Sequence, residues 1–242
     1  MKFFDRPLVI PSILLGVSLI IGLAIVGTGI GARGQSDTIT VTGSSSQNVK
    51  ADEATWAVDV RRTAYADAVP AASTQVSRDG KAVLNYFSQQ KFASSTVIAS
   101  VVSSNQNYSN NGEPTSYTVD QTITVTTSDV DAIDTLSHDI SGINAVVSSG
   151  TLVSPQPPQY YVSSLPALRV SLLGAAIKDA KARAVQIAES GGSTVGALAS
   201  ASSGVVQVLA PNSTNVEDYG EYDTSTVQKE VMVTAHATFY VR

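Results

Sequence analysis

Cysteine is absent from the 242 residues of this chain, so disulfide bonds, a thiolate nucleophile and cysteine-ligated zinc or iron–sulfur sites are excluded. Charge is also scarce: Asp, Glu, Lys and Arg make up 14% of the residues, against about 25% in an average globular protein. The 15 basic and 20 acidic residues give a net charge of −5, whereas proteins that bind nucleic acid cluster basic side chains against the phosphates. Nucleic acid is therefore not an expected partner. Hydrophobic residues, at 43%, are numerous enough to build a folded core.

Histidine is nearly as scarce as cysteine. The two histidines, His138 and His236, are almost a hundred residues apart, and no Gly-x-Ser-x-Gly motif marks a nucleophilic serine. A serine triad requires the nucleophile and its base to lie at hydrogen-bond distance. The sequence therefore predicts no enzymatic activity, no catalytic residue and no cofactor.

One long uncharged segment dominates the amino terminus. Residues 8–32 carry no charged side chain, and these 25 residues exceed the roughly 20 that cross a hydrocarbon core. The apolar part of a secretory signal is shorter, about 7–15 residues, so we expect an uncleaved transmembrane helix that contacts the lipid bilayer. Glycine and alanine at the outer end of the segment leave cleavage open as the alternative.

The positions of the nearby positive charges predict the orientation of this helix. Lys2 and Arg6 precede the apolar segment, and only Arg33 follows it closely. The positive-inside rule places the amino terminus in the cytoplasm and the bulk of the chain outside it, in the periplasm or at the outer side of the plasma membrane. We therefore divide the chain into a tail with a single-pass anchor, 1–33, a linker, 34–37, and an extracytoplasmic domain, 38–242.

The rest of the chain shows strand and helix patterns in an order that occurs twice. Each half begins with a strand, continues with a helix and ends with two hairpin-connected strands. Because hairpin-connected strands are antiparallel, we expect an α+β fold of largely antiparallel sheets backed by helices. The predicted strands are 38–42, 54–61, 96–104, 116–127, 143–153, 195–209 and 226–242, and the predicted helices are 67–91, 129–140 and 164–190.

The longest predicted helix, 164–190, has a narrow apolar stripe that is partly lined by alanine. Its residues recur at spacings of three and four, which places them on one face of a helix. They are Leu173, Ile177, Ala180, Ala184 and Ile187. The small side chains predict a close approach of this helix to a sheet.

An acidic loop near the carboxyl terminus, 215–226, is a candidate cation site. Its carboxylates are Glu217, Asp218, Glu221 and Asp223. Ca²⁺ takes six to eight oxygen ligands, part of which such a loop supplies. The loop lacks the regular spacing of an EF-hand, so a solvated loop without metal is the second interpretation. Together with the polar hairpin tip, 104–115, the loop suggests an alternative function as an extracytoplasmic ligand- or cation-binding module.

Two observations favour association between copies of the chain. Sheets end in edge strands, whose unpaired backbone groups pair readily with other chains. Tyrosines, which are common at protein interfaces, cluster in or beside the predicted loops, although they can equally cover sheet edges within one chain. These tyrosines are Tyr108, Tyr117, Tyr160, Tyr161, Tyr219 and Tyr222.

The order of motifs resembles the SIMPL-domain family, whose YggE-like members are exported bacterial proteins. The matching segments are ITVTG (39–43) followed by Ala51 and Asp52, SYTVDQTITVT (116–126), AAIKDAKARAVQIAESGG (175–192) and VMVTAHATFYV (231–241). The resemblance implies an exported, non-enzymatic domain that forms homo-oligomeric rings and contributes to envelope or oxidative-stress tolerance. It supplies no catalytic residues to assign here.

Overall fold

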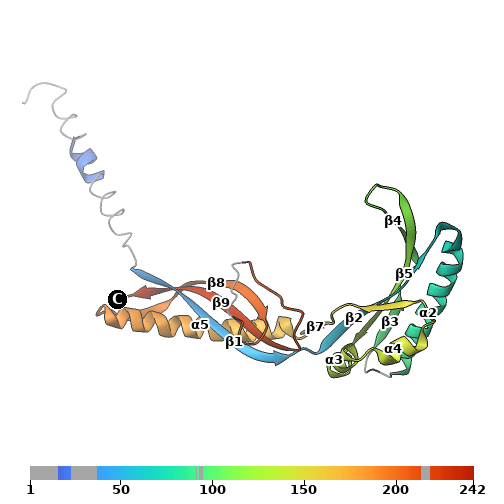
Figure 1. The fold of residues 1–242 in the computed structure, drawn as a ribbon. Helices are drawn as coiled ribbons and strands as arrows, with labels where there is room; N and C mark the ends of the chain where they lie inside the picture. Colours follow the sequence, from blue (N-terminus) through green and yellow to red (C-terminus); the bar gives the residue numbers. More distant parts are fainter. Residues whose placement is uncertain (1–15, 23–36, 91, 93–94, 214–218) are drawn as a thin grey trace, which may run out of the picture.

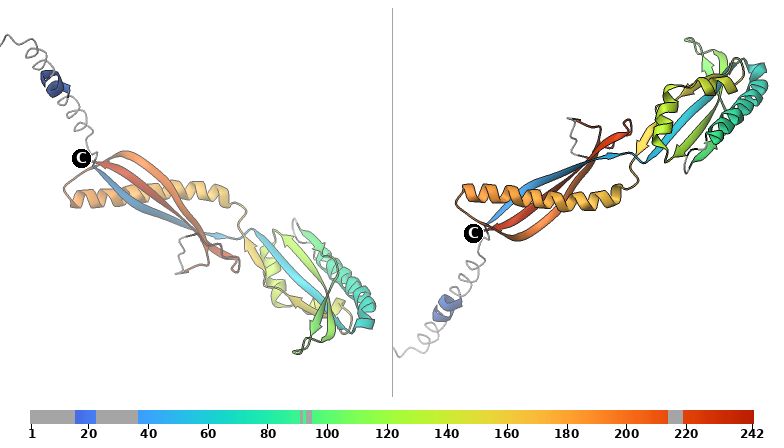
Figure 2. Two further views of the ribbon diagram at one scale, coloured as in Figure 1. Left: turned by 90° about the horizontal axis from the view of Figure 1, so that it is seen from above. Right: turned by 90° about the horizontal axis from the view of Figure 1, so that it is seen from below.

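The computed structural model describes residues 16–22, 37–90, 92, 95–213 and 219–242. The predicted anchor, 8–32, and the predicted linker, 34–37, lie largely outside these residues. Within the described part of the chain, no helix combines the length and the hydropathy that a membrane crossing requires. The folded residues form two lobes that lie end to end and meet at a narrow junction (Figures 1 and 2).

The terminal lobe is built from both ends of the folded chain. Its antiparallel sheet has the strand order β1-β9-β8, and helix α5 lies along one face (Figure 1). Strand β1 pairs with β9 over its whole length, although the two are the first and last of the described strands. The elements of this lobe are β1 (Thr38–Lys50), α5 (Leu165–Ser190), β8 (Val195–Leu209) and β9 (Gln228–Val241).

The inserted lobe comes between β1 and α5 in the chain. Its sheet has the order β3-β5-β2-β6, with β4 also paired to β5 and β7 to β2, and every pair is antiparallel. Its elements are β2 (Glu53–Ala64), η1 (Ala66–Ala68), α2 (Val69–Gln89), β3 (Thr96–Ala99), β4 (Ser103–Tyr108), β5 (Pro114–Thr127), α3 (Val130–His138), α4 (Ser141–Val146), β6 (Leu152–Pro155) and β7 (Gln159–Tyr161).

The predicted α+β fold with antiparallel sheets and helices is confirmed, whereas the division into two consecutive halves is wrong. Strands β8 and β9, which follow helix α5, form their sheet with β1 and not with a strand at 143–153. Residues Ser141–Val146 form helix α4, and only Leu152–Pro155 form a strand, which pairs with β2. A short apolar run suits either structure, and the burial of Ile143 in the core of the inserted lobe favours the helix.

Helix α5 lies close to β1 because the contact is lined by small residues. At Gly43 of β1, a Cβ atom would overlap the backbone of Ala176 and Ala180. The buried residues of α5 recur every four positions. Because four residues turn about 400° around a helix, each step moves the buried stripe about 40° around the axis, and the stripe follows the twist of the sheet. The predicted stripe is right at Ala180 and Ala184 and wrong at Ile187, which is exposed. The buried residues are Leu172, Ala176, Ala180, Ala184 and Ala188.

The core of the inserted lobe forms where the helices cover one face of the sheet. Alternate residues of β2 point into it: Ala54, Trp56, Val58 and Val60. The ring of Trp56 meets Phe87 of α2 edge to face, with centroids 5.6 Å apart. Its indole N–H donates to the carbonyl oxygen of Gln156 at 2.8 Å, so the one polar atom of this buried ring is satisfied.

A buried carboxylate, Asp79 of α2, fastens the loop that follows α4. Its Oδ1 accepts hydrogen bonds from the backbone N–H and hydroxyl of Ser148, at 3.1 and 2.8 Å, and from the amide of Gln75 at 3.0 Å. Its Oδ2 accepts the hydroxyl of Thr151. Burial raises the pKa of Asp79, but the hydrogen bonds from Thr151, Ser148 and Gln75 outweigh burial and hold the pKa below its ordinary value.

Candidate functional site

The two lobes meet at a junction that three segments of the chain form. Two of them are the connections from β1 to β2 and from β7 to α5. The third, which we call the junction segment (residues 219–227), precedes β9 and contacts the inserted lobe. The N–H of Tyr160 donates to the carbonyl oxygen of Thr224 at 2.8 Å. The N–H of Ala51 donates to the carbonyl oxygen of Val227, also at 2.8 Å, and the Val227 side chain packs on the inserted core.

Asp52 ties the two connections together. Its carboxylate accepts the backbone N–H of Ser163 at 2.7 Å and the hydroxyl of the same residue at 2.8 Å. Its own N–H donates to the carbonyl oxygen of Tyr161 at 2.9 Å. The Ala51-Asp52 motif of the sequence therefore has a structural role at the junction.

A fully buried lysine, Lys229 of β9, anchors the junction segment to the sheet. Its ammonium group donates to the carbonyl oxygen of Asp223 at 2.6 Å and lies 3.4 Å from the carboxylate of the same residue. Burial lowers the pKa of Lys229, and the charge of Asp223 opposes this shift. Burial raises the pKa of Asp223, but hydrogen bonds from Thr226 and Ser225 outweigh it and lower this pKa.

The junction segment also pairs with the end of β8. The N–H of Val208 donates to the carbonyl oxygen of Glu221 at 2.8 Å, and the N–H of Asp223 donates back to Val208 at 2.7 Å. Gly220 has a φ of 80°, and a Cβ atom on it would lie 2.9 Å from the carbonyl oxygen of Val206. Glycine is thus favoured where the segment passes beside Val206 of β8.

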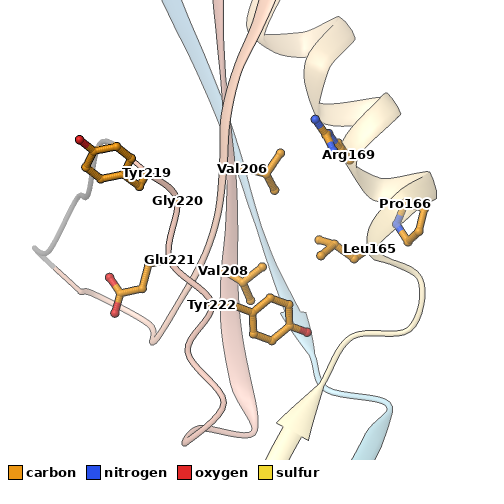
Figure 3. Close-up of a pocket in the computed structure, with 9 residues that line it drawn as sticks. All are labelled: Leu165, Pro166, Arg169, Val206, Val208, Tyr219, Gly220, Glu221 and Tyr222. Atoms are coloured by element: carbon orange, nitrogen blue, oxygen red, sulfur yellow. The ribbon is translucent and has the colours of Figure 1, made fainter.

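A pocket of about 550 Å³ opens between the junction segment, β8 and the first turns of α5 (Figure 3). We call it the junction pocket. Its lining is mainly apolar, with few polar groups, and its size falls within the range of about 300–1,000 Å³ that is typical of small-molecule sites. The lining residues are Leu165, Pro166, Arg169, Val206, Val208, Tyr219, Gly220, Glu221 and Tyr222.

The predicted cation site is only partly described. Glu217 and Asp218 lie outside the described residues. Glu221 lines the junction pocket, and the Asp223 carboxylate accepts hydrogen bonds from its neighbours and from Lys229. Within the part of the chain that the structure describes, no group of three or more His, Asp or Glu side chains could hold a metal ion. The cation site of 215–226 therefore stays a prediction.

The predicted hairpin forms in the inserted lobe, but its tip is shorter than predicted, because residues 104–108 belong to β4 and 114–115 to β5. Strands β4 and β5 pair, and the N–H of Ser109 donates to the carbonyl oxygen of Glu113 at 2.7 Å across the turn. The hairpin projects from the inserted lobe, far from the junction (Figures 1 and 2). The tip at 104–115 and the described part of the loop at 215–226 thus do not form one site.

The two histidines lie in different lobes. His236 of β9 contacts the hydroxyl of Thr42 through Nδ1, at 2.9 Å, on the sheet face opposite α5. His138, at the end of α3, contacts the carbonyl oxygen of Asp134 through Nδ1, at 2.7 Å. The fold therefore does not bring the two imidazoles together in one site.

Each edge of the terminal sheet has a feature that hinders pairing with another strand. On the outer side of β1, the N–H of Ser44 donates to the carboxylate of Asp179 of α5 at 2.9 Å. The pairing of β8 has three register shifts, and the junction segment covers its end at Val208. Bulges and covering segments are devices by which proteins prevent edge-to-edge association.

One edge of the inserted sheet is uncovered by any other described strand, although the pairing of β4 with β5 has one register shift, at Asn107 and Tyr108. We call it the outer edge: β3, β4 and the residues 100–102 between them. Residues 95–112 include no charged side chain. Three large apolar or aromatic side chains on the outer edge are exposed, Ile98 by 59%, Val101 by 84% and Tyr108 by 62%. Among the described elements, β3 and β4 pair only with β5, so no strand covers their other side.

A comparison with family models assigns the chain. The model SIMPL, described as a protein of unknown function (DUF541), matches residues 39–239. The chain belongs to the SIMPL family. The match runs from β1 to β9 and so includes both lobes, which confirms the resemblance seen in the sequence. A comparison with curated proteins gives no match.

The junction pocket of this SIMPL chain is not among the sites that the sequence predicts. Its walls come from three segments that are distant in the chain, and no local motif joins them. One signal was available: in β9 the alternation that buries Val231 and Val233 also places Lys229 on the buried side. A lysine at a buried strand position requires a partner close by, which points to the loop before β9.

Proposed function

We propose that this SIMPL protein is a membrane-anchored, extracytoplasmic scaffold that acts by assembling with copies of itself and has no enzymatic activity. Its role would be protection of the cell envelope, including tolerance of oxidative stress. The uncharged stretch 8–32, with Lys2 and Arg6 before it, supports the anchor and its orientation. The separation of the two histidines, in different lobes, supports a role that does not depend on catalysis.

The observation that carries the proposed assembly is the outer edge. In an antiparallel ladder, the N–H groups of successive residues point alternately toward the partner strand and away from it. The N–H of Ser100 donates to Thr122 of β5, so the N–H groups of Val97 and Ala99 point outward. An added strand would satisfy these groups and bury the exposed side chains of Ile98 and Val101. An uncharged edge with exposed apolar residues is the type of edge that pairs with other chains.

A second copy of the chain fits this edge on electrostatic grounds. The whole chain has a net charge of −5, so two copies repel each other over most of their surfaces. Antiparallel pairing of two outer edges about a twofold axis places each residue opposite a residue of the same uncharged segment. Like-charge pairs, which destabilise paired strands, are then absent from the contact.

Replacing Val101 with lysine tests the assembly. Val101 is 84% exposed, so the variant should fold normally, but the new charge would have to be buried between paired edges. Because a twofold contact contains Val101 of both copies, the burial of two valines is lost at a cost of about 3 kcal/mol, so we expect Val101→Lys to weaken association about a hundredfold. Light scattering coupled to size exclusion, on the full chain in detergent, measures the mass of the assembly at each concentration.

Val170→Lys is the matched control, since Val170 is 73% exposed but lies on α5 in the terminal lobe. It should leave the mass unchanged. A wild-type chain that is monomeric at every concentration would contradict the proposed function. An assembly that Val101→Lys and Val170→Lys affect equally would contradict the outer edge as its contact.

The orientation gives a second test. In cells that express the full chain, we expect it in the membrane fraction after an alkaline wash, because residues 8–32 are long enough to span the bilayer. A protease added outside the cytoplasmic membrane should digest the carboxyl-terminal domain, whereas a cytoplasmic marker protein should survive. A domain that survives with the cytoplasmic marker would disprove the extracytoplasmic location.

A further inference from the structure

We infer that the junction pocket binds a small ligand with an apolar body and a single carboxylate, which pairs with Arg169. The inference does not depend on the proposed assembly, because the outer edge belongs to the other lobe. It rests on three features of the pocket: an apolar floor that opens into the core, one cation at the mouth that forms no ion pair with a described carboxylate, and walls that other contacts hold in place.

The floor of the pocket is an opening into the core of the terminal lobe. Val208 is buried in the cluster that packs beneath α5, and Leu165 and Val206 lie at the margin of that cluster. Between these residues and the junction segment the space of about 550 Å³ is unfilled by the described side chains. An apolar body placed there would remove the half-exposed surfaces of Leu165 and Val206 from water, which is favourable.

The positive charge of Arg169 complements the carboxylate of the inferred ligand. It is exposed on α5, and no carboxylate of the described residues forms an ion pair with it. In Figure 3 its side chain extends from α5 toward Val206, over the pocket, whereas the carboxylate of Glu221 extends away from α5. A guanidinium group binds a carboxylate through two parallel hydrogen bonds, so a ligand carboxylate suits this position.

The walls of the pocket are fixed by contacts outside it. The hydroxyl of Tyr222 accepts the N–H of Val162 at 2.9 Å, and its ring packs on Tyr161 with centroids 6.0 Å apart. The buried ammonium group of Lys229 holds the following residue, Asp223. Since the described wall is already ordered by these contacts, a ligand would pay little conformational entropy to bind.

Binding of 2-naphthoate tests the inference, with 2-naphthalenemethanol as the uncharged probe of the same shape. The full chain is measured in lipid nanodiscs by calorimetry, and empty nanodiscs correct for partition into lipid. We expect saturable binding of 2-naphthoate, and an affinity about tenfold lower for Arg169→Gln, since a charge-assisted hydrogen-bond pair is lost. Arg169→Lys should restore part of the affinity. The alcohol should bind the wild type and Arg169→Gln equally.

Lys178→Gln, which removes an exposed positive charge from the same helix, is the matched control and should bind 2-naphthoate as the wild type does. Val206→Phe should weaken both probes, because it fills the floor of the pocket. Absence of saturable 2-naphthoate binding would overturn the inference, as would equal affinities in the wild type and Arg169→Gln. A change of assembly mass in Arg169→Gln, without naphthoate binding, would instead indicate that a second copy occupies the pocket.

Discussion

Gly43→Ala is expected to destabilise the terminal lobe by about 3 kcal/mol, at the upper end of the cost of an overpacked core. The added Cβ atom would overlap the backbone of Ala176 and Ala180 in α5. A backbone obstruction cannot be relieved by rotating a side chain, so α5 and β1 must move apart. The alanine contacts along the helix would be lost with that movement, because dispersion attraction falls steeply with distance.

The two lobes can be followed separately in this experiment. The chain has one tryptophan, Trp56, which lies in the core of the inserted lobe, so its fluorescence reports that lobe alone. Amide hydrogen exchange in β1 and α5 reports the terminal lobe. We expect Gly43→Ala to reduce protection of β1 and α5 strongly and to change the fluorescence transition much less.

Gly174→Ala is the matched control for this substitution. Gly174 lies within α5, and no atom comes within 4 Å of the position that its Cβ would occupy. Alanine is favoured over glycine in a helix by about 1 kcal/mol, so this variant should be more stable than the wild type. Equal stability of Gly43→Ala and the wild type would contradict the close contact between α5 and β1.

Asp79→Ala is expected to destabilise the inserted lobe by about 3–5 kcal/mol, as the removal of one partner from a buried charged network does. The substitution leaves the N–H and hydroxyl of Ser148, the hydroxyl of Thr151 and the amide of Gln75 without their acceptor. Gln75 and Thr151 are partly buried and Ser148 is exposed, and a hydrogen bond to a charged group contributes about 1.5–3 kcal/mol. The unfolding transition followed by Trp56 fluorescence should move to lower denaturant.

The ionisation of Asp79 adds a pH dependence to this result. Because the folded-state pKa of Asp79 lies below the ordinary value of 3.8, its contribution to stability is complete above that value and is lost as the pH falls through the folded-state pKa. The wild type should therefore lose stability relative to Asp79→Asn on acidification below about pH 4. Asp67→Ala, at an exposed aspartate before α2, should behave as the wild type. Parallel acid profiles of the wild type and Asp79→Asn would contradict the network.

The sequence predicts the elements of this fold better than their partners. The long helix 164–190 and the strand 195–209 agree closely with α5 and β8, since helical spacing and alternation are local signals. The pairing of β1 with β9 has no local signal, because the two strands lie at opposite ends of the domain. The apolar run around Ile143 was ambiguous for a related reason: only its packing against the inserted core distinguishes helix from strand.

In the candidate sites, too, local features are visible in the sequence whereas tertiary partners are not. The carboxylates of 215–226 are visible in the sequence as a cluster of charge, but the role of Asp223 in the structure depends on Lys229 beneath it. Arg169 is an ordinary helix residue in the sequence, and it becomes a candidate ligand-binding residue because the junction segment comes to lie opposite it (Figure 3). Proximity of this kind arises only from the tertiary fold.

The position of β9 has a consequence for the order in which the molecule folds. This strand follows β1 and β8 in the chain and is the middle strand of the β1-β9-β8 sheet, so without these 14 residues neither β1 nor β8 has its partner strand. The inserted lobe is continuous in the chain and can form earlier. Once formed, it brings Asp52 and Ser163 together and thereby shortens the loop that separates β1 from α5. Folding of the inserted lobe thus reduces the conformational entropy that is lost when the terminal lobe forms.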